Sequence, residues 1–189
     1  MNAPEEAPMD ERLVRETLSG DDEAFTELVR RYKRKVFTIV ARHVRNSYEL
    51  DDVCQEIFMK VYQNLRKFRG DAPFEHWVSK IAIHACYDAL RKGRREQGDI
   101  PIDDVAFLLK APPPEGGRDA DAWELLRRGL DRLRPEDRLV ITLMNLEEKS
   151  IREISSLTGW SESKVKVRAF RARKELKRIL EDDNGTRPE

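Results

Sequence analysis

The chain has 189 residues, 36 of them basic and 36 acidic, so its formal net charge is zero although 38% of its residues are charged. Such a length forms one or two domains, and no apolar run approaches the length of a membrane span. We find no signal peptide, so a cytoplasmic protein without membrane insertion is expected. The two cysteines, Cys54 and Cys86, lack metal or redox spacing and are expected to be buried free thiols.

The N-terminal quarter has helical periodicity after a start, residues 1–9, that is expected to be disordered. A short helix is predicted over 10–19, and Asp21 or Asp22 can cap a second helix that ends near Asn46. The solvent side of that helix carries a basic cluster that serves either solubility or nucleic-acid binding, and both readings stay open. Its members are Arg30, Arg31, Lys33, Arg34 and Lys35.

A further helix is predicted from Tyr48 to Phe68. Its inward stripe recurs at helical spacing through Val53, Ile57, Val61 and Leu65. The opposite face is polar and acidic, and it is either simply solvated or docks a basic partner, because complementary charges orient an encounter. This face consists of Asp51, Asp52, Gln55, Glu56 and Gln63.

A loop containing Gly70, Asp71 and Pro73 leads into the next helix, which is predicted to continue to about Lys92, with Phe74 and Trp77 at its start. One side of that helix carries four polar or basic groups at spacings of four, three and four. Such a row can pair with phosphates and stack on bases, although each residue alone is typical of an ordinary surface. The row is Lys80, His84, Tyr87 and Arg91, and basic residues 91–95 extend it.

From Glu96 to Ala122 the composition becomes acidic, with three prolines at 112–114 followed by two glycines. This pattern predicts a linker of about 28 residues, whose ends would lie very roughly 30 Å apart. Helical spacing resumes over 123–133, and Pro135 fits the first turn of another helix that reaches Leu146. Residues 181–189 are expected to be a disordered tail.

The stretch 150–179 predicts a helix-turn-helix. Ser150 and Glu153 form a capping box, Gly159 can end the first helix, and Ser161 can cap the second. From Ser161 to Leu180 there are eight basic and two acidic residues, a local charge of +6. A capped cationic helix after a glycine turn is typical of a major-groove reader, and the alternative is a solvated basic face. Its predicted inner side holds Val165, Ala169, Ala172 and Leu176, and its outer side Ser163, Val167, Phe170, Arg171 and Lys174.

The expected fold is therefore all-α, with two small helical domains, 10–94 and 122–180, joined by a flexible linker, 95–121. Each domain has its own basic surface, yet the whole chain has no net charge. DNA affinity depends largely on neutralising phosphates, so weak binding to DNA by the chain alone is expected. Two surfaces on a flexible tether cannot fix their own separation, and we expect a large protein partner to fix it.

The motifs together resemble bacterial sigma factors of the extracytoplasmic-function (ECF) class of the sigma-70 family, which contain only the second and fourth sigma domains. The resemblance covers nearly everything from Asp21 to Leu180. Four segments carry it: DDEAFTELVRRY, ELDDVCQEIFMKVYQNLRKFRG, FEHWVSKIAIHACYDALRKGRR, and the helix-turn-helix with VKVRAFRARKEL.

The resemblance implies promoter-specific transcription initiation with core RNA polymerase, and neither enzymatic activity nor a cofactor or metal. The acidic face at 51–63 would bind the clamp helices of the polymerase largest subunit. Residues implied to recognise and melt the minus-ten element are Gly70, Asp71, Phe74, Trp77, Lys80, His84, Tyr87 and Arg91. Residues implied to read the minus-thirty-five element are Ser163, Lys164, Lys166, Val167, Arg168, Phe170, Arg171 and Lys174.

Within that last set, Lys166, Val167, Phe170 and Arg171 would lie nearest the base edges, and Lys164 and Arg168 would hold phosphates. Many relatives have a small polar residue in place of Val167 and asparagine in place of His84, so the promoter sequence stays open. The resemblance also implies a monomer when free and an anti-sigma factor that wedges between the two domains.

Two other function classes compete with this interpretation. A stand-alone helix-turn-helix regulator usually dimerises to match paired half-sites, and residues 21–92 would then have no explanation. An enzyme is disfavoured because His43, His76 and His84 show no metal-ligand pattern, and the chain has no phosphate-binding loop.

Overall fold

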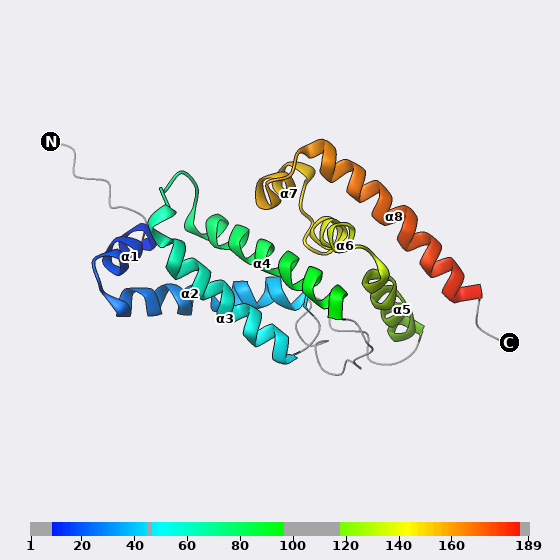
Figure 1. The fold of residues 1–189 in the computed structure, drawn as a ribbon, viewed down its shortest axis with the longest axis horizontal. Coiled ribbons are helices and arrows are strands. Elements are labelled where there is room, and N and C mark those ends of the chain that lie inside the picture. The colour runs from blue at the N-terminus through cyan, green and yellow to red at the C-terminus, as the bar shows by residue number, and fades with distance from the viewer. Residues whose placement is uncertain (1–8, 45–46, 97–117, 186–189) are drawn as a thin grey trace.

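The computed structural model describes residues 9–44, 47–96 and 118–185, and these ranges contain helices and turns but no strand (Figure 1). The predicted all-α fold with two domains is confirmed. None of the described helices is both long enough and apolar enough to cross a lipid bilayer.

The first domain is a helical bundle whose helix ends follow from local chemistry. The Asp21 carboxylate caps the second helix by accepting the backbone N–H groups of Glu23 and Ala24. That helix ends at Ala41, about one turn before the predicted end. The elements are α1 (Met9–Leu18), α2 (Asp22–Ala41), α3 (Ser47–Asn64), the 3₁₀ turn η1 (Leu65–Lys67) and α4 (Phe74–Glu96).

The second domain contains the helix-turn-helix and two supporting helices. A π-helical turn interrupts the helix predicted from Pro135 to Leu146, and Glu148 follows it with a left-handed φ of 53°. The elements are α5 (Arg118–Arg132), α6 (Pro135–Ile141), the π-helical turn η3 (Thr142–Leu146), α7 (Ile151–Thr158) and α8 (Glu162–Gly185).

Further predicted boundaries differ from the structure: α1 begins at Met9, the last residue predicted as disordered, and α3 ends at Asn64, four residues before the predicted end. Helix α4 continues to Glu96 and α5 begins at Arg118, so both enter the segment predicted as a linker. Helix α8 continues to Gly185, inside the segment predicted as a disordered tail. The rest of the predicted linker, 97–117, and the predicted disordered residues 1–8 and 186–189 lie outside the described residues.

The two domains are packed against each other. Helix α4 lies between α2 and α3 on one side and α6 and α7 on the other (Figure 1). One buried apolar cluster runs from Leu13 in α1 through Ala85 and Cys86 in α4 to Leu139 and Val165 in the second domain. The predicted stripe of α3 lies wholly inside this cluster, which confirms it. A smaller cluster joins α5, α6 and α8.

Candidate nucleic-acid and polymerase interfaces

The helix-turn-helix is built from short-range hydrogen bonds that the sequence predicted. Ser150 Oγ accepts the backbone N–H of Glu153 at 3.2 Å, and Glu153 Oε2 accepts that of Ser150 at 2.8 Å. Gly159 adopts the left-handed region with φ 72°, and Ser161 Oγ accepts the N–H of Lys164 at 3.2 Å. The capping box, the glycine turn and the second cap are confirmed.

Helix α8 presents a cationic face with two apolar side chains in its middle. Val165, Ala169 and Ala172 are buried as predicted. Phe170 exposes 70% of its surface and Val167 49%, although both are apolar. The polar and basic neighbours on the same exposed face are Ser163, Lys164, Lys166, Arg171 and Lys174.

Two of the residues implied to contact phosphates already have partners. The ammonium of Lys164 lies 4.1 Å from the centre of the Trp160 ring, in a cation–π contact. Arg168 is half-buried, and its Nη1 lies 3.2 Å from Asp137 Oδ1 in α6. Arg168 therefore anchors α8 on α6, and Lys164 is the more exposed of the two.

The predicted row on α4 is present, but its members differ in exposure. Lys80, His84 and Arg91 are exposed, whereas Tyr87 is half-buried. Although His84 is on the surface, its neighbours partly desolvate the ring, and this, followed by the charge of Lys80, lowers its pKa, so the imidazole is uncharged at neutral pH. The guanidinium of Arg91 lies 5.8 Å from the centre of the Tyr87 ring.

The loop before α4 rests on an aromatic cluster. Gly70 has a φ of 77°, and both Gly70 and Asp71 are exposed. Phe74, however, is only 3% exposed, because its ring packs against Tyr32, Phe68 and Trp77. The expectation that Phe74 contacts DNA is therefore corrected: it supports the loop from below. Trp77 is half-buried in the same cluster.

The predicted polar face of α3 is fully on the surface: all five residues, Asp51, Asp52, Gln55, Glu56 and Gln63, are exposed. Glu56 pairs with Lys60 one turn later at 2.6 Å. Two apolar side chains, Met59 and Tyr62, are also exposed on this helix. Acidic, amide and apolar groups side by side are typical of a protein-docking surface.

Comparison with known proteins decides the family. Residues 28–96 match sigma-70 region 2, and residues 123–176 match sigma-70 region 4. The RNA polymerase sigma-H factor of Pseudomonas aeruginosa is 33% identical over 91% of this chain and 94% of its own. The ECF RNA polymerase sigma-E factor of Escherichia coli K12 is 33% identical over 95% of both chains.

The chain belongs to the ECF sigma factors of the sigma-70 family. Solved structures agree with this assignment. A structure of CnrH in complex with the cytosolic domain of CnrY has 25% sequence identity and a TM-score of 0.61, over 93% of this chain and 99% of that chain. The sigma factor RpoE of Bartonella quintana, in complex with the anti-sigma factor NepR, shares the fold with a TM-score of 0.57, at 19% identity and over 83% of this chain and 96% of that chain.

In this sigma factor a group of buried charges joins the two domains, and the sequence did not predict it. Arg42, just after α2, lies 3.5 Å from Glu147, and their side chains are only 7% and 8% exposed. His43 is 1% exposed, and its Nε2 lies 3.7 Å from the same carboxylate. Arg138 in α6 donates to the backbone carbonyl of His43 at 3.0 Å.

The environment of these groups shifts their pKa values in opposite directions. Burial lowers the pKa of His43, and the carboxylate of Glu147 opposes that effect only in part. Burial alone would raise the pKa of Glu147, but His43, Arg42 and Lys149 together hold it below its ordinary value. Burial lowers the pKa of Arg138 to about 10. At neutral pH this group therefore contains a charged Arg42–Glu147 pair beside an uncharged imidazole.

A second contact between the domains involves the row on α4. The hydroxyl of Tyr87 donates to Glu136 Oε1 in α6 at 3.0 Å. Its ring lies edge-on to Trp160, in the turn of the helix-turn-helix, with centroids 5.8 Å apart. Burial, followed by the Glu136 carboxylate, raises the pKa of Tyr87, which therefore keeps its proton.

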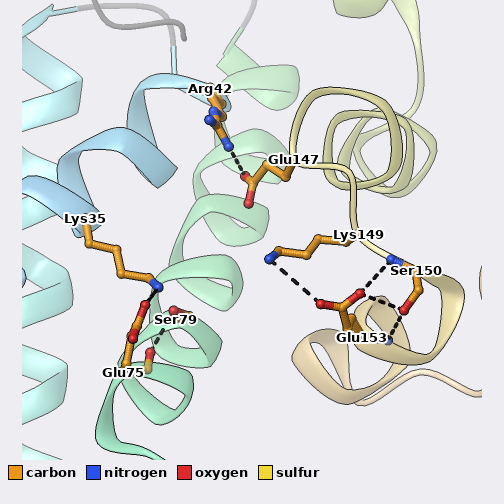
Figure 2. A network of polar contacts seen from close by, with 8 residues as sticks. All are labelled: Lys35, Arg42, Glu75, Ser79, Glu147, Lys149, Ser150 and Glu153. Atoms are coloured by element: carbon orange, nitrogen blue, oxygen red, sulfur yellow. Dashed lines mark hydrogen bonds and ion pairs between the residues drawn. The ribbon is translucent and has the colours of Figure 1, made fainter.

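A cleft of about 640 Å³ opens between α2, α4 and α7. Figure 2 shows its ion pairs: Lys35 with Glu75, and Lys149 with Glu153, each join residues of one domain, whereas Arg42 with Glu147 crosses between them. Within the described residues we find no group of three or more histidine, cysteine or acidic side chains placed to hold a metal ion.

Proposed function

We propose that this sigma factor binds core RNA polymerase and directs it to promoters by reading the minus-thirty-five element as duplex and melting the minus-ten element. The observation that carries the proposal is the exposed cationic face of α8 on a correctly capped helix-turn-helix, in a chain that also carries a separate basic row on α4. A stand-alone regulator would leave the first domain, which matches sigma-70 region 2, without a role.

At the minus-thirty-five element, α8 enters the major groove with Lys166, Val167, Phe170 and Arg171 toward the bases. A recognition helix is suited to this groove because each base pair shows a distinct edge there. Exposed Lys164 and Lys174 contact phosphates, which fix register without reading sequence.

At the minus-ten element, the loop at Gly70 and Asp71 and the row on α4 hold the melted strand. Flipping a base out of the stack costs a few kcal/mol, and a surface with cations, an uncharged imidazole and a phenol can offset it by pairing and stacking. The acidic face of α3 meanwhile binds the clamp helices of the polymerase largest subunit through charge complementarity.

An anti-sigma factor is the proposed inhibitor. The sigma factor RpoE of Bartonella quintana, which shares this fold, is in complex with the anti-sigma factor NepR, and CnrH is in complex with the cytosolic domain of CnrY. We assign the same kind of partner to this sigma factor, bound between its domains.

The proposal is tested by sequencing the transcripts that bacterial core polymerase makes with and without this protein on a genomic template library. We expect new start sites that share minus-thirty-five and minus-ten sequences. Transcripts that do not depend on the added protein would overturn the proposal, and tight promoter binding without polymerase would favour a regulator.

A further inference from the structure

Helix α1 borders the loop that the proposed function assigns to the minus-ten element. It packs on α2 and on the 3₁₀ turn η1, which leads into that loop. A methyl group added to Gly70 would lie 3.6 Å from Glu11 Oε1, in ordinary van der Waals contact. Residues 28–96 match sigma-70 region 2, so α1 lies outside that match. The carboxylate of Glu11 therefore lies directly beside the loop, on a helix to which the match assigns no role.

The two acids in the first turn of α1 differ in their partners. Asp10 Oδ1 accepts from Arg31 Nη1 at 2.6 Å, and its Oδ2 accepts from the hydroxyl of Tyr32 at 2.5 Å. The carboxylate of half-buried Glu11 has neither a hydrogen bond nor an ion pair among residues 9–44, 47–96 and 118–185. A partly buried carboxylate without a partner in the protein favours a ligand that donates a hydrogen bond.

Aromatic packing fixes the place of α1 relative to the loop. Tyr32, which donates to Asp10, packs edge-on against Phe74 with ring centroids 5.4 Å apart. Phe74 supports the loop from below and also packs against Phe68. Asp10 thus ties α1 to the aromatic cluster on which the loop rests. A binding group held by packed elements is placed more precisely than a group on a loop alone.

The chemistry of a carboxylate limits which base it can hold. A base taken out of the stack presents its Watson–Crick edge to the protein. Adenine, cytosine and guanine each carry an exocyclic amine that donates hydrogen bonds, whereas thymine has carbonyl oxygens on both sides of a single N–H. A carboxylate can only accept. It therefore stabilises a base with an amine and repels the carbonyl oxygens of thymine.

We propose that Glu11 is a specificity-determining residue of the minus-ten site. Its carboxylate accepts a hydrogen bond from the exocyclic amine of the base captured at the Gly70 loop, and so selects against thymine at one position. The proposal rests on the function proposed above and adds α1 to a site otherwise formed by the loop and α4. The negative charge of Glu11 also repels phosphates, so the strand presents a base and not its backbone to this side of the loop.

A purely structural role of Glu11 makes a different prediction. A negative charge in the first turn of α1 suits the helix dipole, so its loss would lower stability without changing base preference. Glu11→Gln separates the two roles. Glutamine keeps the size of the side chain and suits the first turn of a helix, but it can also donate a hydrogen bond to thymine.

The test compares wild-type protein, Glu11→Gln and Glu11→Ala, each bound to core polymerase. The template is a promoter found by transcript sequencing, made as a library with all four bases at every minus-ten position, and transcripts are counted for each base. Wild-type protein should use thymine about tenfold less than the best base at one position. This penalty should fall to about threefold or less in both variants, and preferences at the other positions should not change.

Glu16→Gln is the matched control. It makes the same charge change on α1, about 140° around the helix from Glu11, and Glu16 pairs with Arg12 instead of lying at the loop. It should keep the wild-type preferences. Circular dichroism and binding to core polymerase must be as in wild type for a variant to count. A penalty lost in Asp71→Asn but kept in both Glu11 variants would assign the acceptor to the loop and overturn the proposal.

An analogue without the amine tests the hydrogen bond itself. At the position found, the best base is replaced by purine for adenine, pyrimidin-2-one for cytosine or hypoxanthine for guanine. Promoter opening by wild-type holoenzyme should fall about tenfold, and by Glu11→Ala holoenzyme about twofold or less. An equal fall in both would overturn the proposal. If wild-type protein reads the element and both Glu11 variants read it identically, only this inference fails; if it never initiates specifically, the proposed function fails.

Discussion

Phe170 and Val167 are the residues of α8 whose exposure is unusual for their chemistry. They lie one helical turn apart, and cationic side chains surround them. In a major groove, an apolar side chain finds an apolar partner in the 5-methyl group of thymine. We therefore expect thymine at the minus-thirty-five positions that face this pair.

Replacing thymine by deoxyuridine in the minus-thirty-five element removes only that methyl group. Burial of one such group contributes about 0.8 kcal/mol, so holoenzyme binding should weaken about fourfold at a contacted base. In Phe170→Ala the same replacement should have little further effect. Competition binding with the two templates measures this; an equal loss in both proteins would place the methyl contact elsewhere.

Arg171 offers the other base-reading group of this face. Its exposed guanidinium can donate two hydrogen bonds to guanine, so Arg171→Ala should cost roughly 1–3 kcal/mol and change preference at one minus-thirty-five position. Promoter selection from a randomised element measures both. Lys177→Ala, further along α8 and also exposed, is the control and should leave preference unchanged. Unaltered selection by Arg171→Ala would argue against base contact.

At the scale of elements, helix ends and buried stripes were predictable because their causes are local. The capping box at Ser150, the turn at Gly159 and the buried stripe of α3 depend on residues within a few positions of each other. Phe74 was misplaced because a loop breaks the periodicity around it. The density of aromatic residues between 68 and 77 was the signal that could have revealed its cluster.

The turn of the helix-turn-helix gives a prediction of pure backbone strain. A methyl group on Gly159 would meet no atom within 4 Å, so Gly159→Ala adds no clash. Its left-handed φ should nevertheless cost about 1–2 kcal/mol in the free energy of unfolding. Gly159→Asn should cost less, because asparagine tolerates this region better. Urea denaturation ranks the three proteins, and equal midpoints would contradict the argument.

The exposed face of α3 is tested by reversing one charge. Glu56→Arg should weaken binding to core polymerase by roughly tenfold, about 1.4 kcal/mol, and most strongly at low salt. Glu181→Arg is a matched control, because Glu181 also pairs with a lysine four residues away on an exposed helix face. Helical content should not change in either. If the Glu56→Arg variant binds core polymerase normally, the acidic face of α3 is only a solvated surface.

At the scale of the molecule, the contact between the domains was beyond the sequence. Arg138 and the carbonyl that it binds are 95 positions apart, and pairs that distant leave no periodic pattern. The two domains and their surfaces could be predicted, since each has its own hydrophobic pattern. The predicted flexible linker suggested two domains whose separation only a partner can fix. The composition of a linker does not reveal whether the domains that it joins contact each other.

The packing of the two domains against each other, their closed arrangement, should depend on pH through His43. Burial lowers its pKa in the closed state, whereas separation would return it toward its ordinary value of 6.5. Opening then takes up a proton, so the closed state is fully stable above about pH 6.5 and loses stability as the pH falls below it. The charged groups that face this residue are Arg42, Glu147 and Arg138, and Arg138 is itself paired with Asp131.

Scattering from the free protein between pH 7.5 and pH 5.5 should therefore show expansion on acidification. Glu147 should contribute only below its ordinary pKa of 4.5, outside this range. His43→Gln keeps a polar side chain that cannot titrate, and its size should be constant over the same interval. Expansion that persists in His43→Gln would assign the effect to another group.

The π-helical turn at 142–146 holds one residue more per turn than a regular helix. Loss of a single codon there would restore the regular winding and rotate Glu147 by roughly 100°, away from Arg42. Neither promoter-reading helix would change. Insertion or deletion at this one place could therefore change how tightly the two domains pack against each other in a lineage, while the regulon of its sigma factor stays the same.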